Sequence, residues 1–268
     1  MKYIFIIFII FIIFFISIKS VFSKEFSDVL EVELLKGWRQ SNGIHYGGLK
    51  VKLSPGWKTY WRHPGETGFS PEFDWTGSLN LSAVKVLWPH PKIFNDNGML
   101  SFGYEDYVIL PIEFTPYNAA KLIKARLNLR LGICEKLCVP VSRSLTTKLR
   151  ASKTVLDSEI VEYMNRLPKV VSGHELKNMK CEFKVDGQNL IFRSDIEFYN
   201  RDIGFKAAIV ELPESNIWFA LPNIERASNS LRIISKAEQS EDGAFVLNRD
   251  GIIVTLISNN ESVLIQGC

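Results

Sequence analysis

The stretch Arg126-Leu127-Asn128-Leu129-Arg130-Leu131-Gly132-Ile133 carries the clearest structural signal in the chain. Leucine or isoleucine occupies every odd position, and arginine, asparagine or glycine every even one. Successive side chains of a β-strand point to opposite faces, so this alternation predicts a strand with one buried and one solvated face. Residues 144–149 alternate in the same way. We therefore expect two strands, the first ending near Ile133 and the second beginning near Arg143.

Similar strand patterns recur along the chain. They cover residues 49–53, 181–185, 190–192, 206–212, 231–235, 251–257 and 263–265. Turn-forming residues punctuate the first half at 54–56, 63–65, 89–91 and 95–98, and Asp186-Gly187 is a hairpin dipeptide. Many short strands with this spacing are typical of antiparallel sandwiches, so the sequence predicts an all-β chain with two such domains.

One helix is expected to interrupt the strands. Asp157 or Ser158 can cap its start and Pro168 ends it. The residues expected to line its buried face are Leu156, Ile160, Met164 and Leu167. The predicted organisation is a targeting segment at 1–23, a first sandwich at 24–150, a helical linker at 151–179 and a second sandwich at 180–268.

The first 23 residues have the composition of a secretory signal peptide. Lys2 precedes an almost purely Ile/Phe run that ends near Ile16, and Val21-Phe22-Ser23 offers a cleavage site. The alternative is an uncleaved membrane anchor, but the run is shorter than the roughly 20 residues that a spanning helix needs. We expect cleavage near Ser23 and export to a compartment where disulfides form.

Charge and motif content exclude several classes of function. The formal net charge is +3, and loss of Lys2 and Lys19 with the signal lowers it to +1. That balance gives no electrostatic footprint for nucleic acid. The four histidines have no metal-binding spacing to one another and are expected in loops or on the surface: His45, His63, His90 and His174. No metal or other cofactor is expected.

Cys134 and Cys138 stand at the predicted connection between the two alternating strands. Four residues of extended strand span about 13 Å, whereas a disulfide needs Cα atoms within about 7 Å, so a bonded pair requires a turn here. Such a small loop gains only about 2 kcal/mol from crosslinking, against roughly 4.7 kcal/mol for a hundred-residue loop. Three interpretations stay open: a redox-active pair, a structural disulfide, or metal ligands.

Cys181 and Cys268 are the other two cysteines, at the first strand of the predicted second domain and at the last residue. A crosslink between them would close nearly the whole domain, so we expect a structural disulfide. A free thiol at Cys268 is the alternative.

Two aromatic segments are candidates for the surroundings of a site. Residues 56–65 include Tyr60, Trp61 and Arg62, which together can form a wall. Residues 94–106 combine aromatic side chains with glycine and asparagine, a composition suited to a lid.

An ordered set of residues resembles a known family. The set is Pro55-Gly56-Trp57, Tyr60-Trp61-Arg62, Pro64-Gly65, Trp88-Pro89, Gly103-Tyr104-Glu105, Leu110-Pro111, and Cys134 and Cys138 followed by Pro140. It is similar to the periplasmic N-terminal domain of the DsbD/ScsB thiol:disulfide interchange reductases, and more to the ScsB type. The resemblance is strong over about residues 30–150 and loose beyond.

The resemblance implies a fold, an activity and partners. The fold is an immunoglobulin-like sandwich, and the activity is protein-disulfide reduction through Cys134 and Cys138, with Cys138 favoured as the attacking cysteine. The partners are thioredoxin-like periplasmic proteins and a membrane-embedded electron donor, acting in trans because the chain ends without the family's further domains. The processes are copper tolerance or cytochrome c maturation. The residues implied as cap and site wall are Tyr60, Trp61, Phe94, Phe102 and Tyr104.

Two other functions stay open beside thiol:disulfide exchange. One is a non-catalytic binding module that docks a partner or handles Cu(I), for which thiolates are suitable ligands. The other is a structural sandwich whose disulfides only stabilise it.

Overall fold

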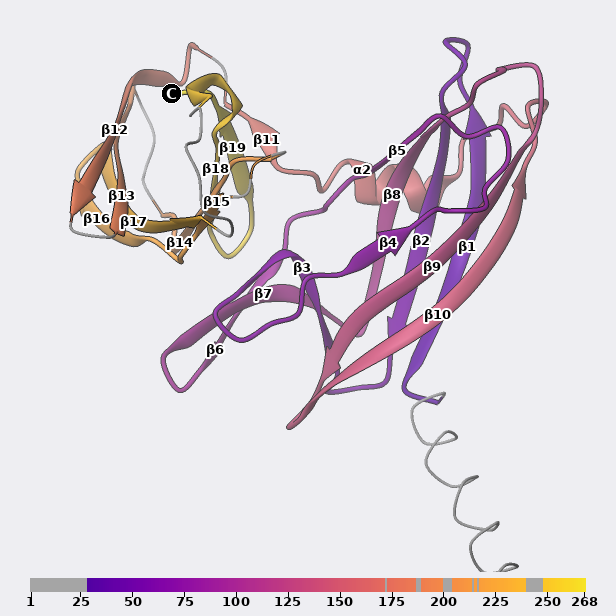
Figure 1. Ribbon diagram of the computed structural model, residues 1–268, viewed down its shortest axis with the longest axis horizontal. Coiled ribbons are helices and arrows are strands. Elements are labelled where there is room, and N and C mark those ends of the chain that lie inside the picture. Colours follow the sequence, from indigo (N-terminus) through magenta and orange to yellow (C-terminus); the bar gives the residue numbers. More distant parts are fainter. Residues whose placement is uncertain are drawn as a thin grey trace, which may run out of the picture.

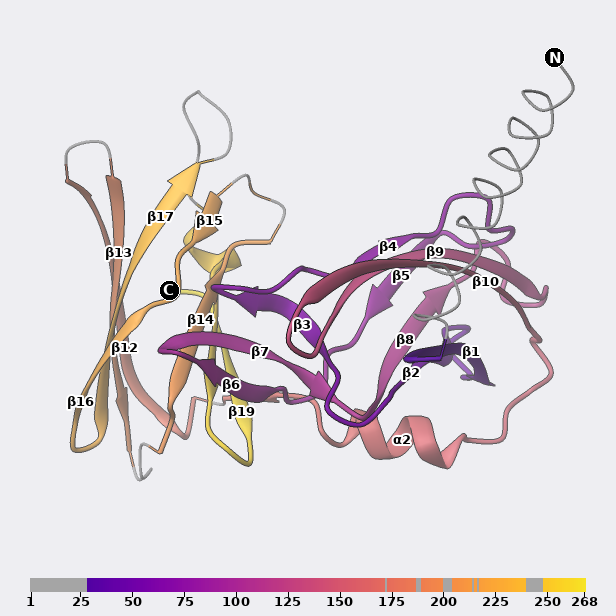
Figure 2. The same ribbon diagram turned by 90° about the horizontal axis from the view of Figure 1, so that it is seen from below.

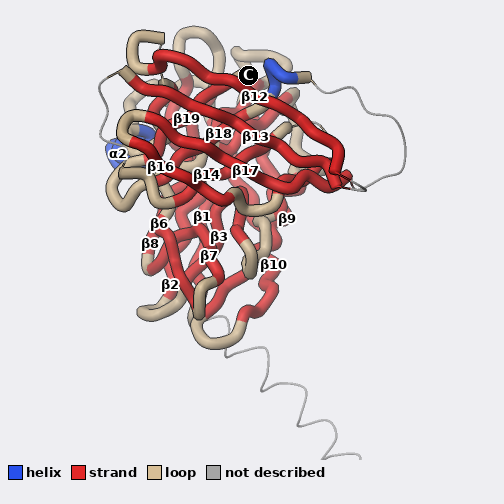
Figure 3. The backbone as a smooth tube through the Cα atoms, turned by 90° about the vertical axis from the view of Figure 1, so that its left-hand side faces the viewer, coloured by secondary structure: helices blue, strands red, loops and turns tan. Residues whose placement is uncertain are grey.

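The computed structural model describes residues 28–171, 173–186, 189–199, 204–213, 215, 217–239 and 248–268. The predicted signal peptide lies outside this range. The described chain is nearly all β, with four sheets arranged as two sandwiches (Figure 1). Viewed from the side of the second sandwich, strands again dominate (Figure 3). The predicted fold class, two immunoglobulin-like antiparallel sandwiches, is confirmed.

The first sandwich contains a four-stranded and a six-stranded sheet. The first sheet has the order β1-β2-β8-β5, with bounds Leu30–Arg39, His45–Leu53, Tyr107–Thr115 and Ala83–Val86. The second has the order β10-β9-β3-β7-β6, with bounds Cys138–Leu149, Ile123–Cys134, Lys58–Gly65, Met99–Glu105 and Lys92–Asp96, and β4 (Glu72–Asp74) pairs with β9. The core lies between them and is built from the inward face of each strand.

The β9–β10 hairpin follows the alternation seen in the sequence. Leu127 pairs with Leu145, and the odd-numbered residues of β9 are buried. β10 begins at Cys138, earlier than the predicted start near Arg143, so the turn is confined to residues 135–137. Pro140 therefore lies inside β10, opposite Gly132. β10 is the edge strand of its sheet, where a residue without an amide proton is tolerated.

The second sandwich has its own core and two sheets. One has the order β11-β19-β18-β14, with bounds Lys169–Val170, Ser262–Gln266, Ile253–Ile257 and Ala207–Glu211. The other has the order β12-β13-β17-β15, with bounds Leu176–Asp186, Asn189–Phe198, Ser230–Gln239 and Ile217–Phe219, and β16 (Asn223–Ala227) pairs with β17. The short helix η2 spans Arg249–Gly251.

The helix α2 (Ser158–Met164) packs on the first sandwich, beneath β8 in Figure 2. Asp157 caps it by accepting a hydrogen bond from the amide of Ile160. Ile160 and Tyr163 form its buried face. The predicted face was wrong at Leu156, which is 63% exposed because it precedes the first turn. None of the helices in the described ranges is long and apolar enough to cross a membrane.

Strand β3 of the first sandwich also contacts the second sandwich. Its pairing with β7 shifts register between Tyr60 and Gly65, and the bulged residues reach the second sandwich. Arg62 binds Glu211 of β14, and the ring of His63 stacks on Trp218 at 6.2 Å. His63 and His45 are both buried, contrary to the predicted surface or loop positions, because both lie on strands that face a core or an interface.

Candidate functional site

A disulfide between Cys134 and Cys138 closes the tip of the β9–β10 hairpin. The two residues are direct partners in the antiparallel register, with their Cα atoms 4.1 Å apart. The three turn residues, Glu135, Lys136 and Leu137, are exposed. The hairpin tip therefore presents the disulfide at the end of the sheet, where another protein can approach it.

The two sulfur-bearing residues differ sharply in exposure. Cys134 is 1% exposed, whereas Cys138 is an exposed residue of the edge strand. Its neighbour Leu137 is 78% exposed. Thiol–disulfide exchange requires a thiolate to reach one sulfur of the disulfide. Access to this pair is thus through Cys138, and Cys134 is the sulfur on the protected side.

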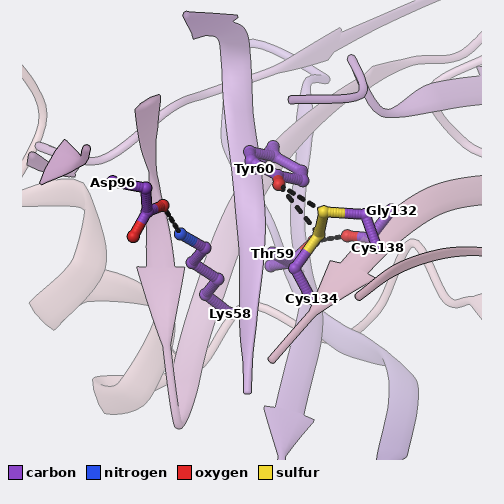
Figure 4. The surroundings of a disulfide bond; sticks show 7 residues. All are labelled: Lys58, Thr59, Tyr60, Asp96, Gly132, Cys134 and Cys138. Carbon is purple, nitrogen blue, oxygen red and sulfur yellow. Dashed lines mark hydrogen bonds and ion pairs between the residues drawn. A yellow bond between two sulfur atoms is a disulfide. The ribbon is translucent and has the colours of Figure 1, made fainter. Parts of the chain in front are cut away.

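The hydroxyl group of Tyr60 contacts both sulfurs (Figure 4). It lies 2.8 Å from Sγ of Cys134 and 3.1 Å from Sγ of Cys138. Neither sulfur of a disulfide carries a proton, so the phenol is the donor in both contacts. Tyr60 is only 2% exposed, and burial, assisted by the negative charge of Asp96, raises the pKa of its hydroxyl group. The phenol consequently stays protonated at neutral pH.

A loop after β3 packs beside the disulfide. A side chain at Gly68 would come within 2.5 Å of the Tyr60 ring, so the backbone of this loop lies directly on that ring. A side chain at Gly132 would come within 3.0 Å of Phe69. Gly132 precedes Cys134 by two residues and thus shares its strand face. Phe69, which is 49% exposed, therefore flanks the disulfide.

The β6–β7 hairpin lies on another side of the disulfide and contacts Lys58 of β3. Lys58 is the register partner of Cys134 on the neighbouring strand. Its Nζ lies 2.6 Å from a carboxylate oxygen of Asp96 and 4.8 Å from the centre of the Phe94 ring. Asp96 and Phe94 both belong to β6, so one lysine connects the strand beside the cysteines to the predicted cap (Figure 4).

The structure distributes the predicted cap and wall residues over two environments. Tyr60 contacts the disulfide directly, and half-buried Phe94 contacts Lys58 beside it. Trp61 and Phe102 are fully buried members of the first core. Tyr104 is also buried in that core and donates a hydrogen bond to the carbonyl of Pro89 at 2.8 Å. Burial raises the pKa of Tyr104 well above its usual value.

Sequence reasoning missed Lys58, Gly68 and Phe69. Lys58 could have been found, because it precedes Tyr60 by two residues and so lies on the same face of a strand. Phe69 lies in a loop, where no periodicity predicts the direction of a side chain. Arg130, four residues before Cys134 on β9, forms an ion pair with Glu72 of β4 at 2.9 Å.

A second disulfide joins Cys181 of β12 to Cys268, which follows β19. It crosslinks the two sheets of the second sandwich and closes a segment with a sequence separation of 87. Cys181 is buried and Cys268 half-buried. Among the described residues, no group of three or more His, Cys, Asp or Glu side chains could hold a metal ion.

A family model matches the sequence of the first sandwich, and a solved structure matches the fold. Residues 31–150 match the family model described as "Thiol:disulfide interchange protein DsbD, N-terminal". The crystal structure of the N-terminal periplasmic domain of ScsB from Proteus mirabilis superposes with a TM-score of 0.65 at 23% sequence identity. The match covers 89% of this chain and 92% of that one, so the fold likeness extends over both sandwiches. No curated protein sequence matches the chain. Residues 31–150 thus form a domain similar to the N-terminal domain of the thiol:disulfide interchange protein DsbD.

Proposed function

We propose that this protein passes electrons by thiol:disulfide exchange through the Cys134–Cys138 pair. The observation that carries the proposal is the exposed Cys138 bonded to the buried Cys134 at an accessible hairpin tip. An incoming thiolate attacks Sγ of Cys138 and forms a mixed disulfide with it. The 134–138 bond breaks, and its electron pair leaves with Sγ of Cys134 as a thiolate. A second thiolate then releases Cys138, which completes a two-electron reduction of the pair.

In the opposite direction, the reduced pair reduces a partner. Cys138, being exposed, attacks the partner's disulfide, and Cys134 resolves the mixed disulfide by attacking Cys138. We propose thioredoxin-like periplasmic proteins as the acceptors and a membrane-embedded protein as the donor in trans. The match of residues 31–150 to the family model supports partners of this thiol-redox kind. The proposed setting of this exchange is copper tolerance or cytochrome c maturation, the two processes that the resemblance implies.

We also propose that residues 1–23 are a signal peptide cleaved near Ser23 and that the mature protein is periplasmic. The family match and the composition of the N-terminal segment support this. N-terminal sequencing of the protein recovered from a periplasmic extract tests the cleavage site. We propose residues 24–150 as the redox domain and 180–268 as the main part of a second domain. The segment 151–179 between them also contributes β11 and the start of β12 to the sheets of the second sandwich.

The reduction potential of the 134–138 pair is the most direct test of the proposal. The protein is equilibrated with thiol buffers of graded potential, alkylated and analysed by mass spectrometry. A redox-active pair equilibrates with the buffers within their usual biological range. A pair that stays oxidised below about −300 mV is typical of a structural disulfide and would overturn the proposed function.

A further inference from the structure

The hydroxyl group of Tyr60 has a chemical role that goes beyond shielding the disulfide. We propose that Tyr60 is a catalytic residue, whose hydroxyl group donates a hydrogen bond to Sγ of Cys134 as this sulfur leaves as a thiolate. The inference rests on the proposed function, because it concerns the same bond. It assigns a specific chemical step to Tyr60, which the sequence had indicated only as part of the aromatic wall of the site.

The geometry provides the donor at the correct sulfur. The hydroxyl oxygen is nearer to Cys134, at 2.8 Å, than to Cys138, at 3.1 Å. When a thiolate attacks the exposed Cys138, a bond forms to that sulfur and the electron pair of the 134–138 bond passes to Cys134. The negative charge thus develops on the sulfur that Tyr60 already contacts, and no movement of the ring is needed.

Burial makes this donor necessary. Cys134 is 1% exposed, so water cannot solvate a thiolate at this position. A buried anion is strongly disfavoured unless a donor or a cation compensates it. Lys58, the register partner of Cys134, has its ammonium group at Asp96, so the phenol is the neighbouring donor whose contact with the sulfur is direct.

The contact favours the transition state over the ground state. The sulfur of a neutral disulfide is a weak acceptor, whereas a thiolate is a charged and much stronger one. An interaction that strengthens as the bond breaks lowers the barrier. The raised pKa of Tyr60 keeps the proton on the phenol, so it stabilises the thiolate by donating a hydrogen bond while remaining a phenol.

The test is the Tyr60→Phe variant of the full chain, which keeps the ring and removes only the hydroxyl group. We expect its 134–138 disulfide to react with dithiothreitol about tenfold to a hundredfold more slowly than that of the parent. The matched control is Tyr163→Phe, which removes the hydroxyl group of a buried tyrosine on α2, a group that donates to the carbonyl of Tyr107. The control should react at the parental rate.

A second readout separates this role from a purely structural one. In a Cys138→Ser background, Cys134 is a free thiol, and its thiolate should form at higher pH when Tyr60→Phe is added. Parental kinetics together with an unchanged thiolate titration would overturn the catalytic role of Tyr60 and leave the proposed function standing. If the parent protein itself does not react with dithiothreitol, the proposed function fails instead.

Discussion

Arg62 on β3 forms a two-pronged ion pair with Glu211 on β14. Its Nη2 lies 2.7 Å from Oε2 and its Nε lies 3.0 Å from Oε1, and both side chains are about one-fifth exposed. The guanidinium group also lies over the ring of Trp61, 3.7 Å from its centre, and donates to the hydroxyl group of Thr255. Tyr60 is only two residues away on the same strand, so this interdomain contact anchors the strand that carries the disulfide contact.

Replacing Arg62 with leucine should therefore destabilise the protein. Glu211, which is mostly buried, would be left without its partner, and we expect a loss of about 2 kcal/mol in the free energy of unfolding. The double variant with Glu211→Leu should recover part of this loss, because it removes the stranded charge. Urea titration of the parent, both single variants and the double variant measures the coupling. Strictly additive losses would show that the pair does not act as a unit.

The two disulfides should differ in lability. We expect mild reductant to open 134–138 well before 181–268. The first closes a very small loop and has one exposed cysteine, whereas the second closes a domain-sized loop, with Cys181 buried. Graded reduction, alkylation and mass spectrometry would follow both pairs in one sample. Equal reduction of the two pairs would remove the main reason for assigning redox chemistry to the first.

Serine variants should separate function from stability. Cys134→Ser or Cys138→Ser should abolish exchange and lower the free energy of unfolding by about 2 kcal/mol or less. Cys181→Ser should leave exchange intact and cost about 4 kcal/mol, because the loop it releases is so much longer. Thermal unfolding and an exchange assay on the same preparations provide the comparison. A large stability loss in the first pair of variants would favour a structural disulfide.

The sequence predicted those features that depend on local periodicity. The alternation in residues 126–133 predicted β9, and its partner β10 pairs leucine with leucine as the pattern requires. The sequence did not predict that both faces of β7 would be buried. Phe102 on this strand therefore lies in the core rather than over the cysteines. The exposure difference between Cys134 and Cys138 also depends on tertiary packing. It arises from the edge position of β10 and the loop on Tyr60, neither of which is a local property.

His45 should make stability depend on pH. It is fully buried, and burial lowers its pKa to about 4. A hydrogen bond to the carbonyl of Lys36 at 2.6 Å raises the pKa but does not offset this effect. The unfolded chain binds a proton near pH 6.5, whereas the folded protein binds it only near pH 4. Stability is therefore constant above pH 6.5 from this group and falls as the pH drops from 6.5 to 4, by up to about 3 kcal/mol.

Unfolding titrations across this range, with His45→Gln as the comparison, would check the assignment. The variant cannot titrate, so the part of the slope between pH 6.5 and 4 that belongs to His45 should disappear. An identical slope in both proteins would mean that other groups cause the acid sensitivity.

The β6–β7 hairpin should act as a cap over the disulfide. Phe94 is half-buried against Lys58, the register partner of Cys134, and truncating its ring to alanine removes apolar cover without emptying the core. We expect Phe94→Ala to speed reduction by glutathione several-fold with little change in stability, since a cap must open for its partner anyway. Phe69→Ala, on the other flank, should act in the same direction.

Two controls make the cap test specific. Tyr117→Ala removes an aromatic ring that is 80% exposed in the loop before β9, at the end of the strand opposite to Cys134, and should not change the rate. Phe102→Ala should instead lower stability by roughly 3 to 5 kcal/mol, because it opens a cavity in the first core. Rates of glutathione reduction for the four variants and the parent, followed by alkylation, give the answer. If neither Phe94→Ala nor Phe69→Ala reacts faster than the parent, the disulfide is already open to small thiols, and selectivity for partners must come from docking rather than from a cap.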